Sequence, residues 1–255
     1  MLMQRKLFHI FLSLITLLVV SSYACRKNNS SQNVLAPVNG TRPSNDTGKQ
    51  VHDTTGYSFL ALGDSYTIGA SVKEDERFPA QTVQFLHSES GKEVTWLKYI
   101  ATSGWTTSNL LNAIYQEKLK DTFDIVTLLI GVNDQYQQQD TTGYRDRFTT
   151  ILKNAIRLAG NRRQHVFILS IPDYSVTPFA SQRDVQFISK QIDQFNNINH
   201  VVANAYGITY IYITDISREA LNDPSLIAFD GLHPSAKMYL RWVYLLGPEI
   251  ARVLK

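Results

Sequence analysis

From residue 56 onward, short apolar runs alternate with longer stretches in which apolar residues recur at helical spacing. This alternation is typical of a parallel sheet covered by helices, because parallel neighbours need a long crossover connection. The apolar runs predict five strands, of which the third is the most hydrophobic and is expected to be central. They are Ser58–Leu62, Val94–Ile100, Asp124–Ile130, His165–Ile171 and Ile208–Ile213.

The amphipathic stretches predict about five helices. The first follows Pro79, and the last begins at Pro234, because proline is favoured at the first position of a helix. That last helix is expected to reach the C-terminus, with Gly247-Pro248 as a candidate interruption. The remaining helices are Thr106–Lys120, Tyr144–Ala159 and one that ends near Tyr206 after the loop Pro172–Ser181.

The first 24 residues are expected to be a signal peptide rather than part of the fold. Arg5 and Lys6 form a short basic region, and the apolar run Leu7–Val20 is too short to span a bilayer comfortably. Cys25 is the single cysteine of the chain, and the residues before it resemble the cleavage site of a bacterial lipoprotein. We therefore expect export and a lipid anchor at Cys25, with ordinary secretion after cleavage near Ala24 as the alternative.

Residues 25–55 are rich in Asn, Ser, Thr, Gly and Pro and lack apolar periodicity. They are expected to form a flexible tether, with a root-mean-square reach on the order of 30 Å, ahead of one globular domain over residues 56–255. The net charge is +3, and without the first 24 residues it is +1, from 23 basic and 22 acidic residues. Because a nucleic-acid-binding protein usually carries a basic surface, we expect no nucleic-acid partner. The sequence leaves the oligomeric state open.

Four polar motifs lie where this arrangement places the carboxyl-end edge of the sheet. The first three directly follow strands, and the fourth lies beyond the fifth strand, just ahead of the last helix. Ligands of open parallel sheets bind at this edge, so the four motifs are expected to converge on one site. They are Gly63-Asp64-Ser65, Ser103-Gly104-Trp105, Gly131-Val132-Asn133-Asp134 and Asp230-Gly231-Leu232-His233-Pro234.

These residue types fit nucleophilic catalysis. A serine hydroxyl such as that of Ser65 is inert near neutral pH unless a base takes its proton. His233 is the best candidate base, and Asp230 can hold its ring in the correct tautomer. Attack by serine creates an oxyanion that needs hydrogen-bond donors. The backbone N–H groups of Ser65 and Gly104 and the side-chain amide of Asn133 are the candidate donors.

The same motifs resemble those of the SGNH (GDSL-type) hydrolase family, whose name lists the serine, glycine, asparagine and histidine found here as Ser65, Gly104, Asn133 and His233. The resemblance covers residues 58–242. It implies a flavodoxin-like three-layer α/β/α sandwich around the five-stranded parallel sheet. It also implies ester hydrolysis through an acyl-enzyme, with Ser65, Asp230 and His233 as the triad. The residue after Gly-Asp-Ser is Tyr66 rather than the leucine of the family's nickname.

Each motif also has a plainer interpretation. Ser65 alone could be a helix N-cap and Gly104 a turn glycine. Asp134 is expected to cap the helix that follows it, and Asp64 to shape the turn before Ser65. Trp105 could contact the substrate or pack in the core. The nucleophile elbow of α/β-hydrolases is excluded, because Gly-x-Ser-x-Gly would require glycine where Thr67 stands.

The expected substrate is a carboxylic ester of a small molecule, glycan or lipid, so that a carbohydrate O-deacetylase, a lysophospholipase and a thioesterase all remain open. The main alternative is a surface lipoprotein that binds a glycan or a partner in the same cleft without turnover. A flavoprotein is a third possibility on fold alone. No motif has metal-ligand spacing or forms a glycine-rich phosphate loop, so we expect no metal and no organic cofactor.

Overall fold

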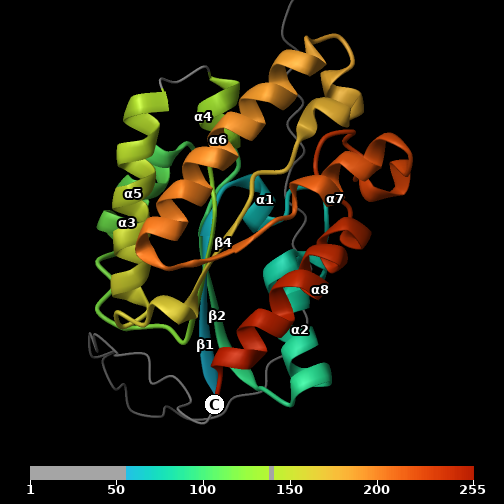
Figure 1. Ribbon diagram of the computed structural model, residues 1–255. Helices are drawn as coiled ribbons and strands as arrows, with labels where there is room; N and C mark the ends of the chain where they lie inside the picture. The colour runs from blue at the N-terminus through green and yellow to red at the C-terminus, as the bar shows by residue number, and fades with distance from the viewer. Residues whose placement is uncertain (1–55, 138–140) are drawn as a thin grey trace, which may run out of the picture. The chain divides into compact units, whose positions relative to one another are not determined.

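The computed structural model describes residues 56–137 and 141–255 (Figure 1). The expected signal peptide, Cys25 and the tether lie outside these residues. Within the two described ranges, no helix is both long enough and apolar enough to cross a membrane.

Five strands form one parallel sheet, as the sequence predicts. In the sheet they follow the order β2-β1-β3-β4-β5, so β3 is central. Leu62 of β1 lies between Ile100 of β2 and Leu128 of β3. This is the strand order of flavodoxin-like folds. The strands are β1 (Tyr57–Gly63), β2 (Val94–Ala101), β3 (Ile125–Leu129), β4 (Val166–Leu169) and β5 (Thr209–Ile211).

Helices cover both faces of this sheet. In Figure 1, α3, α5 and α6 lie on one side of the strands, and α2 and α8 lie together on the other. The three-layer α/β/α sandwich is therefore confirmed. Because both faces are covered, β3 and β4 are buried along their whole length. The five long helices are α2 (Phe78–Ser90), α3 (Thr107–Glu117), α5 (Thr141–Leu158), α6 (Val185–Tyr206) and α8 (Ala236–Val253).

Three short helices were not predicted, and all of them lie at the carboxyl-end edge of the sheet. They are α1 (Ser65–Ile68), α4 (Val132–Tyr136) and α7 (Thr214–Arg218), which follow β1, β3 and β5 respectively. Each has only four or five residues, too few to show apolar periodicity. Two of the predicted motifs, Gly63-Asp64-Ser65 and Gly131-Val132-Asn133-Asp134, run into these short helices.

Two predictions about the last helix are wrong. The helix begins at Ala236, with Ser235 as its N-cap, whereas Pro234 pairs with Ile227 in an isolated antiparallel bridge. Nor does Gly247-Pro248 interrupt the helix, which runs on to Val253. Gly247 lies so close to α2 that an added Cβ would be 2.4 Å from Phe85 Cδ1. Tight packing against α2 thus supports the helix at Pro248, which cannot donate a backbone hydrogen bond.

The ends of three other elements also differ from the predictions. Residues Arg163–His165 form a 3₁₀ turn, so that the fourth strand begins at Val166. The fifth strand keeps only Thr209–Ile211. Helix α3 ends at Glu117, because Lys118 takes a left-handed conformation with φ +48°. Local backbone geometry determines where these elements begin and end, and the pattern of apolar residues does not predict that geometry.

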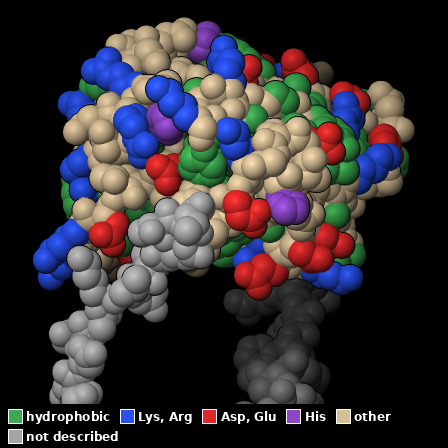
Figure 2. All heavy atoms as spheres, turned by 90° about the horizontal axis from the view of Figure 1, so that it is seen from below, with side chains coloured by type: hydrophobic (Ala, Val, Ile, Leu, Met, Phe, Trp, Pro, Cys, Tyr) green, Lys and Arg blue, Asp and Glu red, His purple; other side chains and the backbone are tan. Residues whose placement is uncertain are grey.

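The surface seen from below Figure 1 carries charges of both signs. Figure 2 shows Lys and Arg side chains alongside Asp and Glu side chains, with hydrophobic side chains between them. No single-sign stripe crosses this face. The mixed surface agrees with the near-neutral net charge of the chain.

The order of the strands determines where a ligand is expected to bind. Successive connections turn in opposite directions from β1, which lies between β2 and β3. In flavodoxin-like sheets the crevice for a ligand opens at this switch point, outside the carboxyl ends of β1 and β3. Ser65 lies just beyond the end of β1, and Asn133 lies in α4, the short helix that follows β3.

Candidate active site

Ser65 occupies the first position of α1, separated from β1 only by the N-cap residue Asp64. The Asp64 carboxylate caps this helix by accepting a hydrogen bond from the Tyr66 backbone N–H at 3.0 Å. Gly63 allows the end of β1 to approach β3, since a Cβ at this position would lie 2.3 Å from the Leu129 carbonyl oxygen. The Ser65 hydroxyl has no hydrogen-bond partner among the described residues, although the residue is only 6% exposed.

Asp64 shapes this turn, as expected, and it is fully buried. Burial is the main cause that raises the pKa of its carboxyl to about 8, and the nearby charge of Asp134 adds to the effect. Its Oδ2 has no hydrogen-bond partner in the described part of the chain. Asp64 therefore holds a proton far more readily than an ordinary aspartate, and its carboxyl group serves to cap α1.

Asp230 and His233 form a tight pair in the loop before α8. His233 Nδ1 lies 2.5 Å from Asp230 Oδ2, and Asp230 Oδ1 accepts the backbone N–H groups of Leu232 and His233 at 3.0 Å each. The Ser71 hydroxyl also donates to Oδ2, at 2.6 Å. Burial alone would raise the pKa of Asp230, but the hydrogen bonds from His233, Ser71 and the backbone outweigh it and lower that pKa. The carboxylate stays ionised and fixes the imidazole ring.

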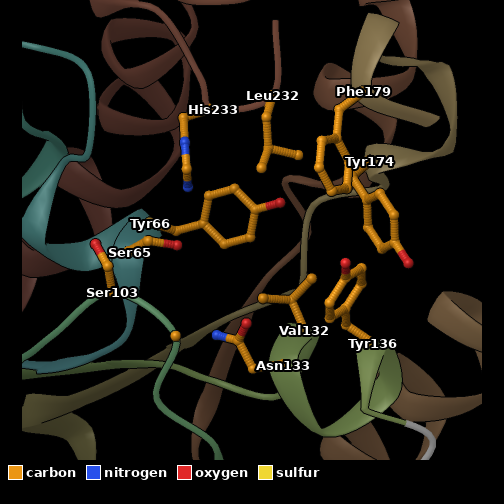
Figure 3. A pocket seen from close by; sticks show the side chains of 11 residues that line it. Ser65, Tyr66, Ser103, Val132, Asn133, Tyr136, Tyr174, Phe179, Leu232 and His233 are labelled. Atoms are coloured by element: carbon orange, nitrogen blue, oxygen red, sulfur yellow. The ribbon is translucent and has the colours of Figure 1, made fainter. Parts of the chain in front are cut away.

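With Nδ1 engaged by Asp230, the other ring nitrogen of His233 is free to face the cavity beside Ser65 (Figure 3). No hydrogen bond joins the Ser65 hydroxyl to His233 among the described residues. Such bonds are often long before substrate binds. The His233 carbonyl accepts the Ala228 N–H at 2.8 Å, and the Pro234 bridge follows directly. The loop that carries the ring is thus held on both sides.

Gly104 and Asn133 lie across the cavity from His233. Gly104 has a φ of +83°, and nothing lies within 4 Å of an added Cβ, so its backbone borders open space. The Asn133 side-chain amide donates to the Trp105 carbonyl at 3.0 Å. This bond uses one amide hydrogen and leaves the other available to a ligand. Gly131 opens the helix of Asn133 with a φ of +129°, in a position where a Cβ would lie 2.4 Å from the Tyr144 hydroxyl.

The structure therefore gathers Ser65, Gly104, Asn133 and His233 around one cavity, with Asp230 bonded behind His233. The cavity measures about 240 Å³. Its far side is apolar and aromatic (Figure 3). Val132 and Leu232 belong to two of the predicted motifs and Tyr66 follows a third, whereas no sequence pattern marked the other three wall residues. The six are Tyr66, Val132, Tyr136, Tyr174, Phe179 and Leu232.

Two expectations about neighbouring residues are corrected or narrowed. Asp134 does not cap the helix that follows it. Its carboxylate instead accepts the Thr107 N–H at 2.8 Å and the Thr107 hydroxyl at 2.6 Å, so it caps α3, which precedes it in sequence. Arg147 pairs with the same carboxylate at 3.3 Å. Trp105 packs against the core and does not line the cavity.

Comparison with protein families decides what kind of protein carries this site. Residues 61–241 match the model of the GDSL-like Lipase/Acylhydrolase family. The chain belongs to this family. It is accordingly an ester-hydrolysing enzyme with a GDSL-type fold, as its sequence motifs suggest. A search of curated proteins found no match to this chain.

Solved structures show the same fold at low sequence identity. TesA is 15% identical, with a TM-score of 0.60 over 77% of this chain and 99% of TesA. The lipase/acylhydrolase from Enterococcus faecalis is 20% identical, with a TM-score of 0.60 over 78% of this chain and 97% of that protein. Axe2, an acetylxylan esterase from Geobacillus stearothermophilus, is 18% identical, with a TM-score of 0.55 over 76% and 94%.

Proposed function

We propose that this hydrolase is a serine esterase in which Ser65, His233 and Asp230 form the catalytic triad. The observation that carries the proposal is that an ionised Asp230 holds His233 at the same cavity as an unpaired, nearly buried Ser65 hydroxyl. This hydroxyl lines the cavity and makes no structural hydrogen bond within the described residues. The same hydroxyl is available for attack on a substrate.

In the first half of the reaction, Ser65 Oγ attacks the carbonyl carbon of the ester while His233 takes its proton. The tetrahedral intermediate then collapses. The bond to the alcohol oxygen breaks, and His233 returns the proton to that oxygen, which leaves an acyl-enzyme. Asp230 stabilises the imidazolium that exists between these two transfers.

In the second half, water replaces the alcohol. His233 removes a proton from the water as it adds to the acyl carbon, and then protonates Ser65 Oγ as the carboxylic acid departs. In both halves the oxyanion is held by the backbone N–H groups of Ser65 and Gly104 and by the free amide hydrogen of Asn133. Each well-placed donor of this kind is worth about 10²–10³ in rate.

A panel of p-nitrophenyl esters with acyl chains of increasing length tests this proposal. The wild-type protein is expected to hydrolyse at least the short members, and Ser65→Ala is expected to lose about 10⁴-fold or more in kcat with an unchanged melting temperature. The exposed Ser88→Ala serves as the matched serine control. A wild-type protein inactive on every ester, or a Ser65→Ala protein that keeps its rate, would contradict the proposal.

We further propose that the enzyme is exported and lipid-anchored, from the basic and apolar pattern of residues 1–24 and from Cys25 alone. In a bacterial host that processes lipoproteins, the full chain is expected to incorporate a labelled fatty acid, and Cys25→Ala is expected to lose the label. Secretion of unlabelled wild-type protein would favour ordinary cleavage near Ala24 instead.

A further inference from the structure

Tyr66 follows the proposed nucleophile directly and carries a hydroxyl that faces the cavity and that the reaction does not use. The residue is 3% exposed, and its ring meets the His233 ring edge-on, with the centroids 5.8 Å apart. Figure 3 shows the hydroxyl pointing away from Ser65, into the aromatic side of the cavity. Among the described residues it has no hydrogen-bond partner.

The Tyr66 phenol can bond a ligand that enters the cavity. Burial raises the pKa of Tyr66 well above its usual value, so the group is a neutral hydroxyl that can both donate and accept. A purely hydrocarbon ligand group beside it would displace water and leave this hydroxyl without a partner, at a cost of about 1–3 kcal/mol. A ligand group bearing its own hydroxyl would avoid that cost.

The surrounding walls are apolar and aromatic. The rings of Tyr136, Tyr174 and Phe179 lie 6.1–6.3 Å from one another. Arg183 packs on the rings of Tyr136 and Phe179 and donates to the Tyr136 hydroxyl at 3.1 Å. The Tyr136 hydroxyl accepts this bond, whereas that of Tyr66 takes part in no bond within the described residues. The wall offers flat apolar faces together with the unpaired hydroxyl of Tyr66.

A sugar ring has the matching chemistry, with apolar C–H faces and hydroxyl groups around its edge. Its size also fits, since a cavity of about 150 Å³ already accommodates benzene and this cavity measures about 240 Å³. One six-membered ring can be accommodated there.

The aromatic side of the cavity lies where the alcohol part of the ester is expected. His233 must protonate the departing alcohol oxygen, so the alcohol lies on the His233 side of the reacting carbon. Tyr66 and Leu232 lie next to His233 and also line the cavity, so they connect His233 with the aromatic side.

We propose that Tyr66 determines specificity: its hydroxyl pairs with a hydroxyl on the sugar part of an acylated carbohydrate, whose ring lies against Tyr136, Tyr174 and Phe179. This inference rests on the proposed esterase function and names its substrate class. A site built to bond a substrate hydroxyl discriminates strongly against analogues that lack it.

Two acetate esters with the same ring size test the inference. Methyl mono-O-acetyl-β-D-xylopyranoside carries ring hydroxyls, and cyclohexyl acetate carries none. The wild-type enzyme is expected to have the higher kcat/KM on the sugar ester. Tyr66→Phe, which removes one oxygen atom, is expected to reduce the ratio of the two kcat/KM values at least tenfold.

Tyr239→Phe is the matched control. The Tyr239 hydroxyl likewise has no partner within the described residues, but it is buried in the protein and does not line the cavity. Its loss is expected to leave the ratio unchanged. If the melting temperature shows that Tyr66→Phe does not fold, the wild-type enzyme is assayed instead on monodeoxy versions of the xyloside acetate. A tenfold loss of kcat/KM on removing one hydroxyl supports the inference, and equal kcat/KM values for all of these esters overturn it.

The remaining outcomes separate the two proposals. A Tyr66→Phe enzyme with an unchanged ratio overturns the inference, as does a wild-type enzyme that hydrolyses p-nitrophenyl hexanoate but neither ring ester. Both of these results leave the esterase function in place. A wild-type protein that hydrolyses no ester at all overturns the esterase function itself.

Discussion

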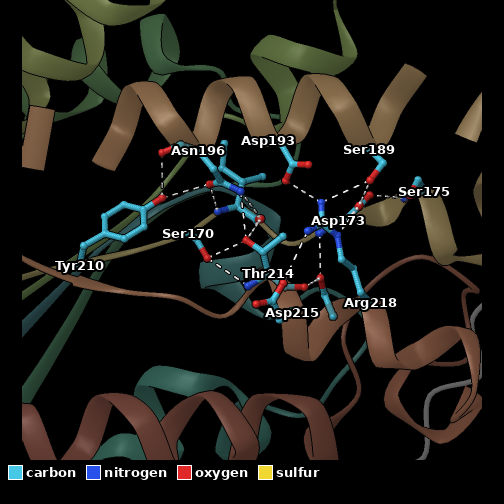
Figure 4. A network of polar contacts seen from close by, with 12 residues as sticks. Ser170, Asp173, Ser175, Ser189, Asp193, Asn196, Tyr210, Thr214, Asp215 and Arg218 are labelled. Carbon is cyan, nitrogen blue, oxygen red and sulfur yellow. Dashed lines mark hydrogen bonds and ion pairs between the residues drawn. The ribbon is translucent and has the colours of Figure 1, made fainter. Parts of the chain in front are cut away.

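Two polar clusters lie at the same edge of the sheet, and they differ in how completely their hydrogen bonds are satisfied. At the ends of β4 and β5, Ser170 accepts the Ile213 N–H at 2.8 Å and the Thr214 N–H at 3.0 Å, and Asn196 bonds both backbone groups of Ile171 (Figure 4). At the ends of β1 and β3, the hydroxyls of Ser65 and Tyr66 have no partner within the described residues.

This difference indicates that the first cluster maintains the fold and that the second takes part in the reaction. A satisfied polar network fixes backbone positions, whereas an unsatisfied buried group keeps its hydrogen-bonding capacity for a ligand. The two clusters are also connected. Asp173, held by Arg218 at 2.9 Å, immediately precedes Tyr174 of the cavity wall. Substitutions in the first cluster should therefore change stability most, and substitutions in the second should change rate most.

The largest expected effect is that of Asp230→Asn. The amide keeps the shape of the side chain but cannot stabilise the imidazolium and favours the wrong tautomer of His233. We expect kcat to fall about 10⁴-fold, with a melting temperature close to that of the wild type. The exposed Asp215→Asn is the control. A fall of less than tenfold in a folded Asp230→Asn protein would remove Asp230 from the triad.

In the satisfied cluster, Arg218→Met should act on stability. Asp173 has a fully buried side chain, and its pKa is lowered because hydrogen bonds from Ser175, Ser189 and Arg218 outweigh the effect of burial. Without the guanidinium, a buried carboxylate loses its counter-charge. We expect a loss of about 3 kcal/mol in the free energy of unfolding, measured by denaturant titration. Equal stability of the variant and the wild type would show that this network is not a scaffold.

Asn133→Ala returns to the unsatisfied cluster. It removes one oxyanion donor, and we expect kcat to fall about 10²–10³-fold while KM changes little. Steady-state kinetics on p-nitrophenyl acetate measures the changes in kcat and KM separately. Asn199→Ala, which removes a buried amide bonded to Tyr144, is the contrasting variant and should lower stability rather than kcat. An increase in KM alone for Asn133→Ala would assign Asn133 to substrate binding.

The last prediction concerns Asp64 and the slope of stability with pH, which is small for each pH unit. Its pKa is about 8 in the folded protein and 3.8 in a model compound, so the folded state holds one more proton between these values. This contribution to stability is complete below about pH 4 and is lost as the pH rises towards 8, with a slope of up to about 1.4 kcal/mol per pH unit.

Asp64→Asn should flatten that slope, and the exposed Asp146→Asn should not. Unfolding free energies measured from pH 5 to pH 8 give the comparison. Parallel pH profiles for Asp64→Asn and the wild type would show that Asp64 is ionised when folded.

The sequence predicted the sheet and the reacting residues well, because both depend on short, strongly patterned segments. Apolar runs marked all five strands, and Ser65, Gly104, Asn133 and His233 follow strand ends or precede the last helix. The cavity wall could not be predicted in the same way. Tyr136, Tyr174 and Phe179 lie on short helical turns without periodicity, and only tertiary packing brings them to Ser65.

The errors have a similar cause. The general preference of proline for helix starts predicts that Pro234 opens the last helix, but Pro234 instead pairs with Ile227 across the loop. Asp134 was assigned to the nearest helix in sequence, whereas the end of β3 lies beside α3 in space. Local rules identified which residues matter, and the topology decided which of them meet.

The central claim is that Ser65 is a nucleophile activated by His233. Incubation with a fluorophosphonate probe, followed by intact-mass and peptide analysis, tests this claim most directly. We predict a single adduct on Ser65, absent in Ser65→Ala and formed at least 10³-fold more slowly in His233→Ala. A wild-type protein that remains unlabelled, or a His233→Ala protein labelled at the wild-type rate, would contradict the account.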